Sequence, residues 1–278
     1  MIEKVTAGVD WISCTLGKEH IGYQTWRGDA LYALEQISKA GYQTNPRKLL
    51  GYEGIAAGNC FVGENETHGY AQFSGEKADY AFSYLAHPQA HYSRLDVQVT
   101  VKRTKMDANE GKRCYRASID NNALLPKGRR RKIWIIVGSD GGDTVYVGSP
   151  SSEQRARIYN KEVQSEDVEF SRCWRYEVVY RNDLSTQLYT TITNSTLERA
   201  DECLSQVTNW LTKRGVSIRG LASVGRAVLP IERTKPTDVE RKLRWLEHQV
   251  KPTVAYLTSL GFRALVADVL DLPLSEES

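Results

Sequence analysis

The clearest pattern along the chain is a strict alternation of apolar and polar residues over "SRLDVQVTVKR", residues 93–103. Successive side chains of a β-strand point to opposite faces, so this alternation predicts a strand with one apolar and one polar face. The apolar positions are Leu95, Val97, Val99 and Val101. The polar positions are Arg94, Asp96, Gln98 and Thr100. We expect the first face in the core and the second to carry residues suited to ion binding or chemistry.

Similar patterns predict the remaining elements of the first 190 residues. The expected strands lie in residues 9–16, in 58–75 as a pair around the turn "ENET", in 132–148 as a hairpin around the turn "GSDGGD", and in 156–163 and 173–181. The expected helices lie in residues 28–41, ending at a glycine, and in 76–87.

Helical patterns dominate from about residue 195 onwards. Apolar residues recur at helical spacing over 195–211, behind a Ser-x-x-Glu capping box formed by Ser195 and Glu198. Residues 235–272 predict a helical hairpin that is broken or bent near Pro252.

The predicted fold class is therefore α+β, with a mainly antiparallel sheet and helices in a domain over residues 1–190. A helical C-terminal region over residues 191–278 follows it. The pattern leaves open whether these helices pack on the same domain or stand apart.

Composition narrows the functional classes. The chain has 278 residues, and its 37 Lys and Arg nearly balance its 34 Asp and Glu, so binding of nucleic acid would have to come from a local patch. Its five cysteines are scattered and never form a C-x-x-C pair, which argues against a disulfide framework and a thiolate metal site and favours the cytoplasm. No apolar run approaches the length of a membrane span, so we expect no membrane partner.

Three of the predicted strands carry polar residues two positions apart, a spacing that places side chains on one face. The sets are Asp96 with Gln98, Arg157 with Tyr159 and Lys161, and Arg175 with Glu177. If the strands are neighbours, one sheet face collects carboxylates, an amide, a phenol and cations. Mg²⁺ or Mn²⁺ could use the oxygen donors, and a tyrosine beside such a metal is a plausible nucleophile toward a phosphodiester. The alternative is an ordinary solvent-facing sheet surface.

The densest basic run is "KGRRRK", residues 127–132, in the loop that precedes the predicted hairpin. Its arginines and second lysine are Arg129, Arg130, Arg131 and Lys132. Contacts to DNA phosphates are a natural use of such a run, and a solvated loop is the alternative.

The stretch "YVGSPSSEQRARIYNKEV", followed by "WRYEVVYR", resembles the signature of the replication initiation factor family, also called Rep-trans. This family contains initiators of rolling-circle plasmids, replication proteins of some filamentous phages, and relaxases of conjugative transposons. "SRLDVQV" is similar to the family's Arg-x-Asp strand, "VDWISCTL" to its opening Asp-Trp strand, and "RKLRWLEHQVKPTVAYL" to its closing helix. The resemblance spans about residues 9–260.

The resemblance implies a nicking endonuclease and strand transferase of the broad HUH class, in which a tyrosine attacks single-stranded DNA and forms a 5′-phosphotyrosyl bond. Tyr159 matches the nucleophile, with Arg157 and Lys161 holding the phosphate or stabilising its charge. The His-hydrophobe-His motif of standard HUH enzymes is absent, so the metal ligands implied are Asp96, Glu177 and, as a weaker third, Gln98. We expect Arg94 and Arg175, together with residues 129–132, to contact DNA. His87 and His91 are alternative ligands.

The implied substrate is single-stranded or locally melted DNA at an origin of a plasmid, a phage or an integrative element. A helicase is a candidate protein partner and a homodimer a candidate assembly. The family pattern has a second aspartate where this chain has Thr100, which motivates an alternative function as a catalytically inactive DNA-binding module of the same fold. A third alternative is an α+β protein with a chance match, which predicts neither metal nor DNA binding.

Overall fold

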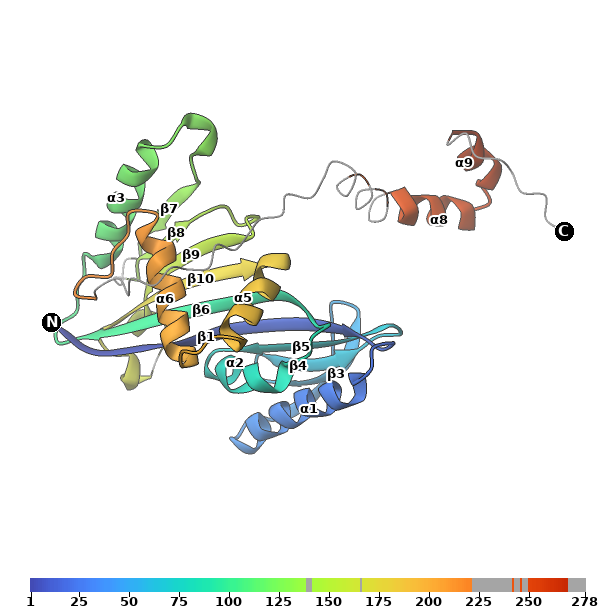
Figure 1. The fold of residues 1–278 in the computed structure, drawn as a ribbon, viewed down its shortest axis with the longest axis horizontal. Helices are drawn as coiled ribbons and strands as arrows, with labels where there is room; N and C mark the ends of the chain where they lie inside the picture. Colours follow the sequence, from blue (N-terminus) through green and yellow to red (C-terminus); the bar gives the residue numbers. More distant parts are fainter. Residues whose placement is uncertain (139–141, 166, 222–241, 243–245, 247–249, 270–278) are drawn as a thin grey trace. The chain divides into compact units, whose positions relative to one another are not determined.

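A ten-stranded antiparallel β-sheet forms the centre of the protein in the computed structural model (Figure 1), which describes residues 1–138, 142–165, 167–221, 242, 246 and 250–269. The strand order is β2-β3-β4-β5-β1-β6-β10-β9-β8-β7. The strands are β1 (Ile2–Gly17), β2 (Thr44–Leu49), β3 (Tyr52–Ala57), β4 (Cys60–Glu64), β5 (His68–Ser74), β6 (His91–Arg103), β7 (Ile133–Ile136), β8 (Thr144–Val147), β9 (Gln154–Asn160) and β10 (Cys173–Arg181). The predicted α+β class with an antiparallel sheet is confirmed.

Helices cover one face of this sheet. The helices and 3₁₀ turns are α1 (Tyr23–Lys39), α2 (Glu76–Ala81), η1 (Phe82–Leu85), α3 (Glu110–Ala123), η2 (Lys127–Arg129), α4 (Lys161–Gln164), η3 (Val168–Phe170), α5 (Asp183–Thr193), α6 (Arg199–Thr212), α8 (Lys251–Ser259) and α9 (Arg263–Val269). In Figure 1, α5 and α6 cross β6 and β1, and α2 lies beside them. At the two wings, α1 packs near β3–β5 and α3 packs against β7–β9.

Strand β6 lies at the middle of the sheet, between β1 and β10. Leu95, Val97, Val99 and Val101 are fully buried on the helix-covered face, as the alternation predicts. The opposite face of β6 holds the polar residues, so burial of the apolar set fixes the direction in which the polar set points.

The chain divides into two compact units, residues 1–231 and 232–278. Helices α5 and α6 belong to the first unit, where α6 contacts β1 and β6. In the second unit, α8 begins next to Pro252, at a helix start where proline is tolerated. Much of the helical hairpin expected over 235–272 lies outside the described residues. Within the described part of the chain, no helix is both long and apolar enough to cross a membrane.

Two local predictions need correction. The predicted strand over 156–163 ends at Asn160, because the Asn160 side chain accepts a hydrogen bond from the Glu162 amide (3.1 Å) and caps the short helix α4. The predicted Ser195–Glu198 capping box does not form. Glu198 itself occupies the N-cap of α6, and the Ser195 hydroxyl hydrogen-bonds Glu202 (2.9 Å).

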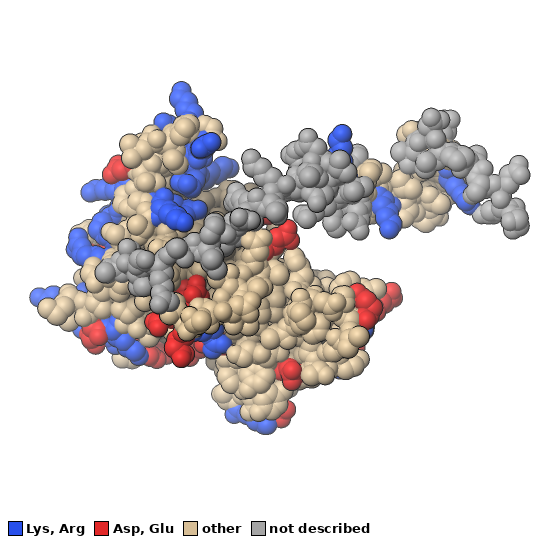
Figure 2. All heavy atoms as spheres, in the orientation of Figure 1, with Lys and Arg blue, Asp and Glu red and all other residues tan. Residues whose placement is uncertain are grey.

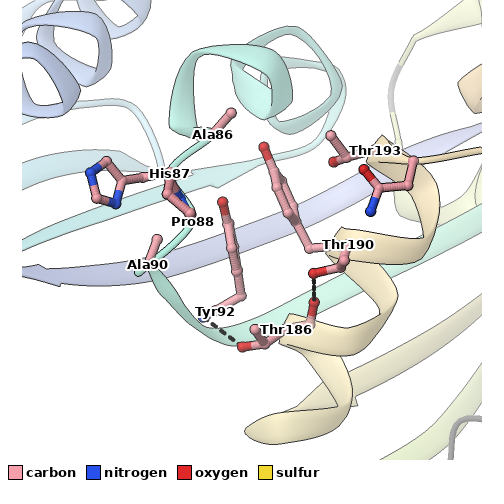
Figure 3. Close-up of a pocket in the computed structure, with 10 residues that line it drawn as sticks. Ala86, His87, Pro88, Ala90, Tyr92, Thr186, Thr190 and Thr193 are labelled. Carbon is pink, nitrogen blue, oxygen red and sulfur yellow. Dashed lines mark hydrogen bonds between the residues drawn. The ribbon is translucent and has the colours of Figure 1, made fainter. Parts of the chain in front are cut away.

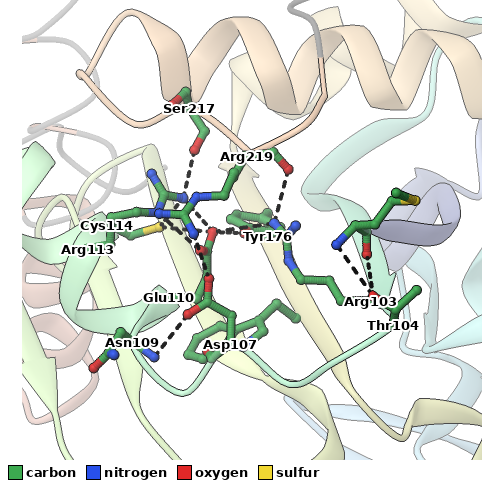
Figure 4. Close-up of polar contacts among 12 residues, drawn as sticks. Arg103, Thr104, Asp107, Asn109, Glu110, Arg113, Cys114, Tyr176, Ser217 and Arg219 are labelled. Atoms are coloured by element: carbon green, nitrogen blue, oxygen red, sulfur yellow. Dashed lines mark hydrogen bonds and ion pairs between the residues drawn. The ribbon is translucent and has the colours of Figure 1, made fainter.

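A buried carboxylate fixes the base of α3 to the sheet (Figure 4). Glu110 has no exposed surface and accepts hydrogen bonds from Arg113 and from the hydroxyl of Tyr176. Arg113 and Arg103 also donate to the carbonyls of Ser217 and Arg219, at 2.9 and 3.1 Å.

Burial acts to raise the pKa of Glu110, but hydrogen bonds from Arg113 and Tyr176 and the charges of both arginines outweigh it, so the pKa lies below its usual value. This network joins α3, the core strand β10 and the segment after α6.

Candidate active site

The strands that carry the predicted site residues are neighbours in the sheet, in the order β1, β6, β10, β9. In this register Glu177 pairs with Gln98 on one side and with Arg157 on the other. One step along, Arg175 pairs with Thr100 and Tyr159. Paired residues of an antiparallel sheet share a face, so the structure brings the polar sets of all three predicted strands together.

Glu177 is the centre of this group. Its carboxylate is fully buried and accepts hydrogen bonds from Nη2 of Arg157 at 2.9 and 2.7 Å. The hydroxyl of Tyr159 donates to the same carboxylate, at 3.4 Å from Oε2. Burial and the charge of Glu177 raise the pKa of Tyr159 above its usual value, against the opposing effect of Arg175. A tyrosine in this state needs a proton acceptor to become a nucleophile, and Glu177 is in contact with it.

Asp96 lies beside Glu177 and is held from the other side by Arg94. Nε and Nη2 of Arg94 donate to its two oxygens at 2.9 and 2.5 Å. Only 1% of Asp96 is exposed, and burial together with the charge of Glu177 raises its pKa to about 8, against the lowering effect of Arg94. Burial and the neighbouring Glu177 therefore favour the protonated form of Asp96 at neutral pH.

Asp10 is a site residue that the strand patterns did not single out. Its Oδ1 accepts a hydrogen bond from Nη1 of Arg175 at 2.6 Å, and Nε of Arg175 donates to Thr100 at 2.9 Å. Burial and Glu177 raise the pKa of Asp10, while Arg175, Lys161 and Arg157 act in the opposite direction.

The position of Asp10 depends on an irregularity in β1. The register with β6 shifts between Val9 and Trp11, which pair with Val97 and Asp96, so Asp10 is the extra residue of a β-bulge. Alternation along a regular strand cannot anticipate such a position. The available signal was the aspartate of the "VDWISCTL" resemblance itself.

Lys161 stays close to the site although it has left the strand. It is the first residue of α4, and its pKa is lowered by burial and by Arg175, with Asp10 and Glu177 acting to raise it. Its ammonium lies 5.0 Å from the centre of the Phe170 ring. The sequence prediction was wrong about the strand, and the role of Lys161 beside Tyr159 stays a prediction.

The donors suit a hard divalent cation in chemistry. Asp96, Glu177 and Gln98 offer oxygen atoms, and a cation would offset the burial and the charge of Glu177 that raise the pKa of Asp96. The structure also shows Gln98 accepting a hydrogen bond from Thr100 at 2.7 Å. Among the described residues, no group of three or more His, Cys, Asp or Glu side chains is arranged to hold a metal ion. Any ion here would thus rely on two carboxylates and neutral donors.

The glycine of the Gly-Ser motif has a structural role. Gly148 follows β8 with φ at +107°, a region that side-chain-bearing residues rarely adopt. A Cβ there would lie 3.0 Å from the carbonyl oxygen of Gln154. The glycine thus permits the tight return of the chain from β8 to β9.

The basic run, residues 127–132, directly precedes β7, which is an edge strand of the sheet. Figure 2 shows Lys and Arg side chains gathered over α3 and its connection to β7. Arg129, Arg130 and Lys132 are exposed and Arg131 is half-buried, in the segment that joins these two elements. Their use in DNA binding stays a prediction. Arg175, by contrast, is only 7% exposed at its side chain, and it is committed to Asp10 in this structure.

The histidines considered as alternative ligands lie elsewhere. Nε2 of His87 is 3.0 Å from the carbonyl oxygen of Ile21, and His91 is exposed at the start of β6. His87 lines a cavity of about 400 Å³ between the η1–β6 loop and α5 (Figure 3). Tyr92 and Tyr189 stack in its wall, with ring centres 3.8 Å apart.

Comparison with known proteins identifies the family and a similar fold. No curated protein matches the chain. Among solved structures, it is similar to a rolling circle replication initiator protein from Geobacillus stearothermophilus, with 18% identity and a TM-score of 0.53 over 76% of this chain and 85% of that chain, a likeness that concerns the fold. The family described as replication initiation factor matches residues 91–270, which is more than half of the sequence. The chain therefore belongs to the replication initiation factor family.

Proposed function

We propose that the protein nicks and rejoins single-stranded DNA through a 5′-phosphotyrosyl intermediate, as a rolling-circle replication initiator or as a relaxase. The observation that carries the proposal is the contact between the Tyr159 hydroxyl and the Glu177 carboxylate, on a sheet face that also holds Arg157 and Arg175. Lys161 lies directly after β9 and interacts with Glu177. This geometry combines a nucleophile, a proton acceptor and cations for a phosphate.

In the proposed reaction, the oxygen of Tyr159 attacks the phosphorus of a phosphodiester while its proton passes to Glu177. The new bond joins the tyrosine to the 5′-phosphate, and the bond from phosphorus to the 3′-oxygen breaks. The departing 3′-oxygen takes a proton from solvent and becomes the free 3′-hydroxyl that primes synthesis. Rejoining is the reverse reaction, so the energy of the cut bond is kept in the phosphotyrosyl bond.

The cations of the site have separate tasks. Arg157 is held in place by Glu177, and its side chain is 31% exposed, so it can reach a phosphate oxygen while it remains anchored. Lys161, the first residue after β9, adds a positive charge that interacts with Asp10 and Glu177. Asp96 and Glu177, with Gln98, would hold Mg²⁺ or Mn²⁺, which stabilises negative charge on the phosphate when bound.

A covalent-adduct assay tests the proposal. The protein is mixed with a pool of single-stranded oligonucleotides with random centres and Mn²⁺, and the products are separated on a denaturing gel. Tyr159→Phe should abolish the adduct. Tyr32→Phe is the matched control, because Tyr32 is an exposed tyrosine on α1, which packs near β3–β5 and away from this sheet face. An adduct that survives Tyr159→Phe would refute the assignment.

A non-catalytic DNA-binding module is the second candidate. It is favoured by Arg94 and Arg157, which already bind the carboxyl groups of Asp96 and Glu177, and by the low exposure of Tyr159, which is 3%. Salt-sensitive binding without any adduct, unchanged in Tyr159→Phe, is the result that this candidate predicts. The helicase partner and the homodimer stay predictions.

A further inference from the structure

A second group of side chains lies on the sheet face that carries Tyr159 and Glu177. It comes from β10, β9, β8 and β7, on the side of β6 away from β1. Arg155 precedes Arg157 by two residues on β9, and it pairs with Val179, which in turn pairs with Asp96. The next pair along is Arg181 with Arg94. The face thus continues from Tyr159 through Arg157 to Arg155, a distance of about 13 Å along the strand at 3.3 Å per residue.

Arg155 lacks a counter-charge. The side chain of Arg155 forms no hydrogen bond or ion pair with another described residue, and its Nε is buried without a partner. Arg94 and Arg157, in contrast, each hold a carboxylate. Burial lowers the pKa of Arg155, and Arg181, Arg94 and Arg157 lower it further, with Asp96 acting weakly in the opposite direction. A half-buried cation among like charges is a position at which an anion would be stabilised.

An aromatic pair lies next to this position. Trp134 on β7 pairs with Tyr146 on β8, and Tyr146 pairs with Arg157, so all three share the polar face. The two rings are stacked, with centres 4.9 Å apart and planes 14° from parallel. Both side chains are half-buried, while the alternate residues Ile133 and Ile135 pack on the core. A half-exposed stacked pair offers a ring surface to a nucleotide base.

We propose that Arg155, Arg181, Trp134 and Tyr146 form a flanking-nucleotide subsite, which binds one phosphate and one base of the DNA strand next to the bond that is cut. Arg155 and Arg181 hold the phosphate, and the Trp134–Tyr146 pair stacks on the base. The inference rests on the proposed function, because it assigns this strand to the substrate of Tyr159.

The chain connects this subsite to the basic loop. Arg181 donates to the carbonyl of Pro150, and the Gly148 amide donates to the carbonyl of Lys132 at 2.9 Å. Lys132 is the last residue of the basic run and directly precedes β7. In the strand register the subsite therefore lies between Tyr159 and Lys132, the last residue of the basic run.

Binding measurements without cleavage test this subsite. A fluorescein-labelled 12-mer of oligothymidylate is titrated with protein in EDTA over a series of NaCl concentrations, and the affinity is read from fluorescence anisotropy. Arg155→Gln should weaken binding and reduce the slope of log affinity against log salt by about 0.7, the value for one lost phosphate contact on a single strand. Trp134→Ala should weaken binding by about 5- to 100-fold with an unchanged slope.

Matched variants separate this role from a structural one. Trp134→Phe should keep most of the affinity, and Arg47→Gln, on the exposed edge strand β2, should bind like the unmodified protein. Arg155→Gln should melt at the same temperature as the unmodified protein or higher, because it removes a cation without a partner. A lower melting temperature for Arg155→Gln would indicate a structural role and would overturn the inference.

Other outcomes also decide the question. An unchanged salt slope in Arg155→Gln would overturn the subsite. A second outcome would also overturn the subsite. If inorganic phosphate raises the melting temperature of the unmodified protein but not that of Arg155→Gln, and both bind DNA equally well, then Arg155 binds a free anion and not the DNA strand. These measurements do not depend on nicking, so a missing covalent adduct would count against the proposed function and leave the subsite to be judged by its own binding data.

Discussion

Nη1 of Arg175 lies 2.6 Å from Oδ1 of Asp10, although the two residues are on strands separated by β6. The guanidinium crosses β6 at Thr100, whose hydroxyl accepts from Nε of Arg175 and donates to Gln98. Thr100 stands where the family pattern has a second aspartate. The carboxylate of Asp10 reaches the same guanidinium from the bulge in β1, so this chain has an acid near that position from a different strand.

This arrangement predicts an asymmetric effect of removing the two partners. Arg175→Gln should destabilise the protein by about 3–5 kcal/mol, because it leaves buried carboxylates without compensation. Asp10→Asn alone should cost less, since burial and Glu177 already disfavour the charge on Asp10. The double variant should be more stable than Arg175→Gln. Urea unfolding of the three variants measures these differences, and equal costs for both single variants would contradict this account.

The raised pKa of Asp96 predicts that the free energy of unfolding falls as pH rises. The folded protein keeps a proton on Asp96 up to about pH 8, whereas the unfolded chain releases it near pH 3.8. Between these values the folded state binds more protons, so its stability declines by up to ~1.4 kcal/mol per pH unit. Asp96→Asn removes this term. Its melting temperature relative to the unmodified protein should increase from pH 5 to pH 8, and a constant difference would show that Asp96 titrates normally.

The lowered pKa of Glu110 predicts the opposite pH dependence of stability. Its pKa is lowered, so its contribution to stability is present above its ordinary pKa of 4.5 and is lost as pH falls through the lower value of the folded state. Glu110→Gln should cost about 3–5 kcal/mol at pH 7, and less in acid. Glu35→Gln is the control, because its ion pair with Lys39 is exposed and screened by solvent, so its loss should hardly change the stability. A cost for Glu110→Gln that is as small as the control's would refute the role of the buried network.

The carboxylate pair also predicts that Mn²⁺ binding depends on pH. An ion between Asp96 and Glu177 must displace the proton that Asp96 holds below about pH 8. The apparent affinity should therefore rise by about tenfold per pH unit from pH 6 and level off above 8. Titration of the free-Mn²⁺ signal in electron paramagnetic resonance measures it. Affinity that is independent of pH, or unchanged in Asp96→Asn, would place the ion elsewhere.

The sequence predicted the α+β class with an antiparallel sheet and the polar face on which the candidate site lies, whereas the roles of the site residues stay predictions. The alternation over residues 93–103 fixed which face of β6 is polar, and the resemblance grouped Tyr159 with Glu177, which the β9–β10 register confirms. Strands β2 and β3 and helices α3 and α5 had no sufficiently regular pattern and were not predicted.

The site residues that sequence reasoning missed depend on features without a sequence period. Asp10 reaches the site through a bulge, and the isolation of Arg155 is visible only once its neighbours across two strands are known. Lys161 was assigned to a strand because the predicted strand was continued past Asn160, whereas the Asn160 side chain caps the short helix that begins at Lys161.

Identification of the residue that carries the DNA tests the central claim most directly. Trypsin cleaves after Arg157 and Lys161 and releases Ile158–Lys161, a tetrapeptide in which Tyr159 is the only tyrosine. After adduct formation, nuclease trimming and digestion, mass spectrometry should find the added nucleotide 5′-phosphate on this peptide. Finding it instead on the peptide 176–181, which contains Tyr176 and Tyr180, or on a residue other than tyrosine, would contradict the assignment of Tyr159 as the nucleophile.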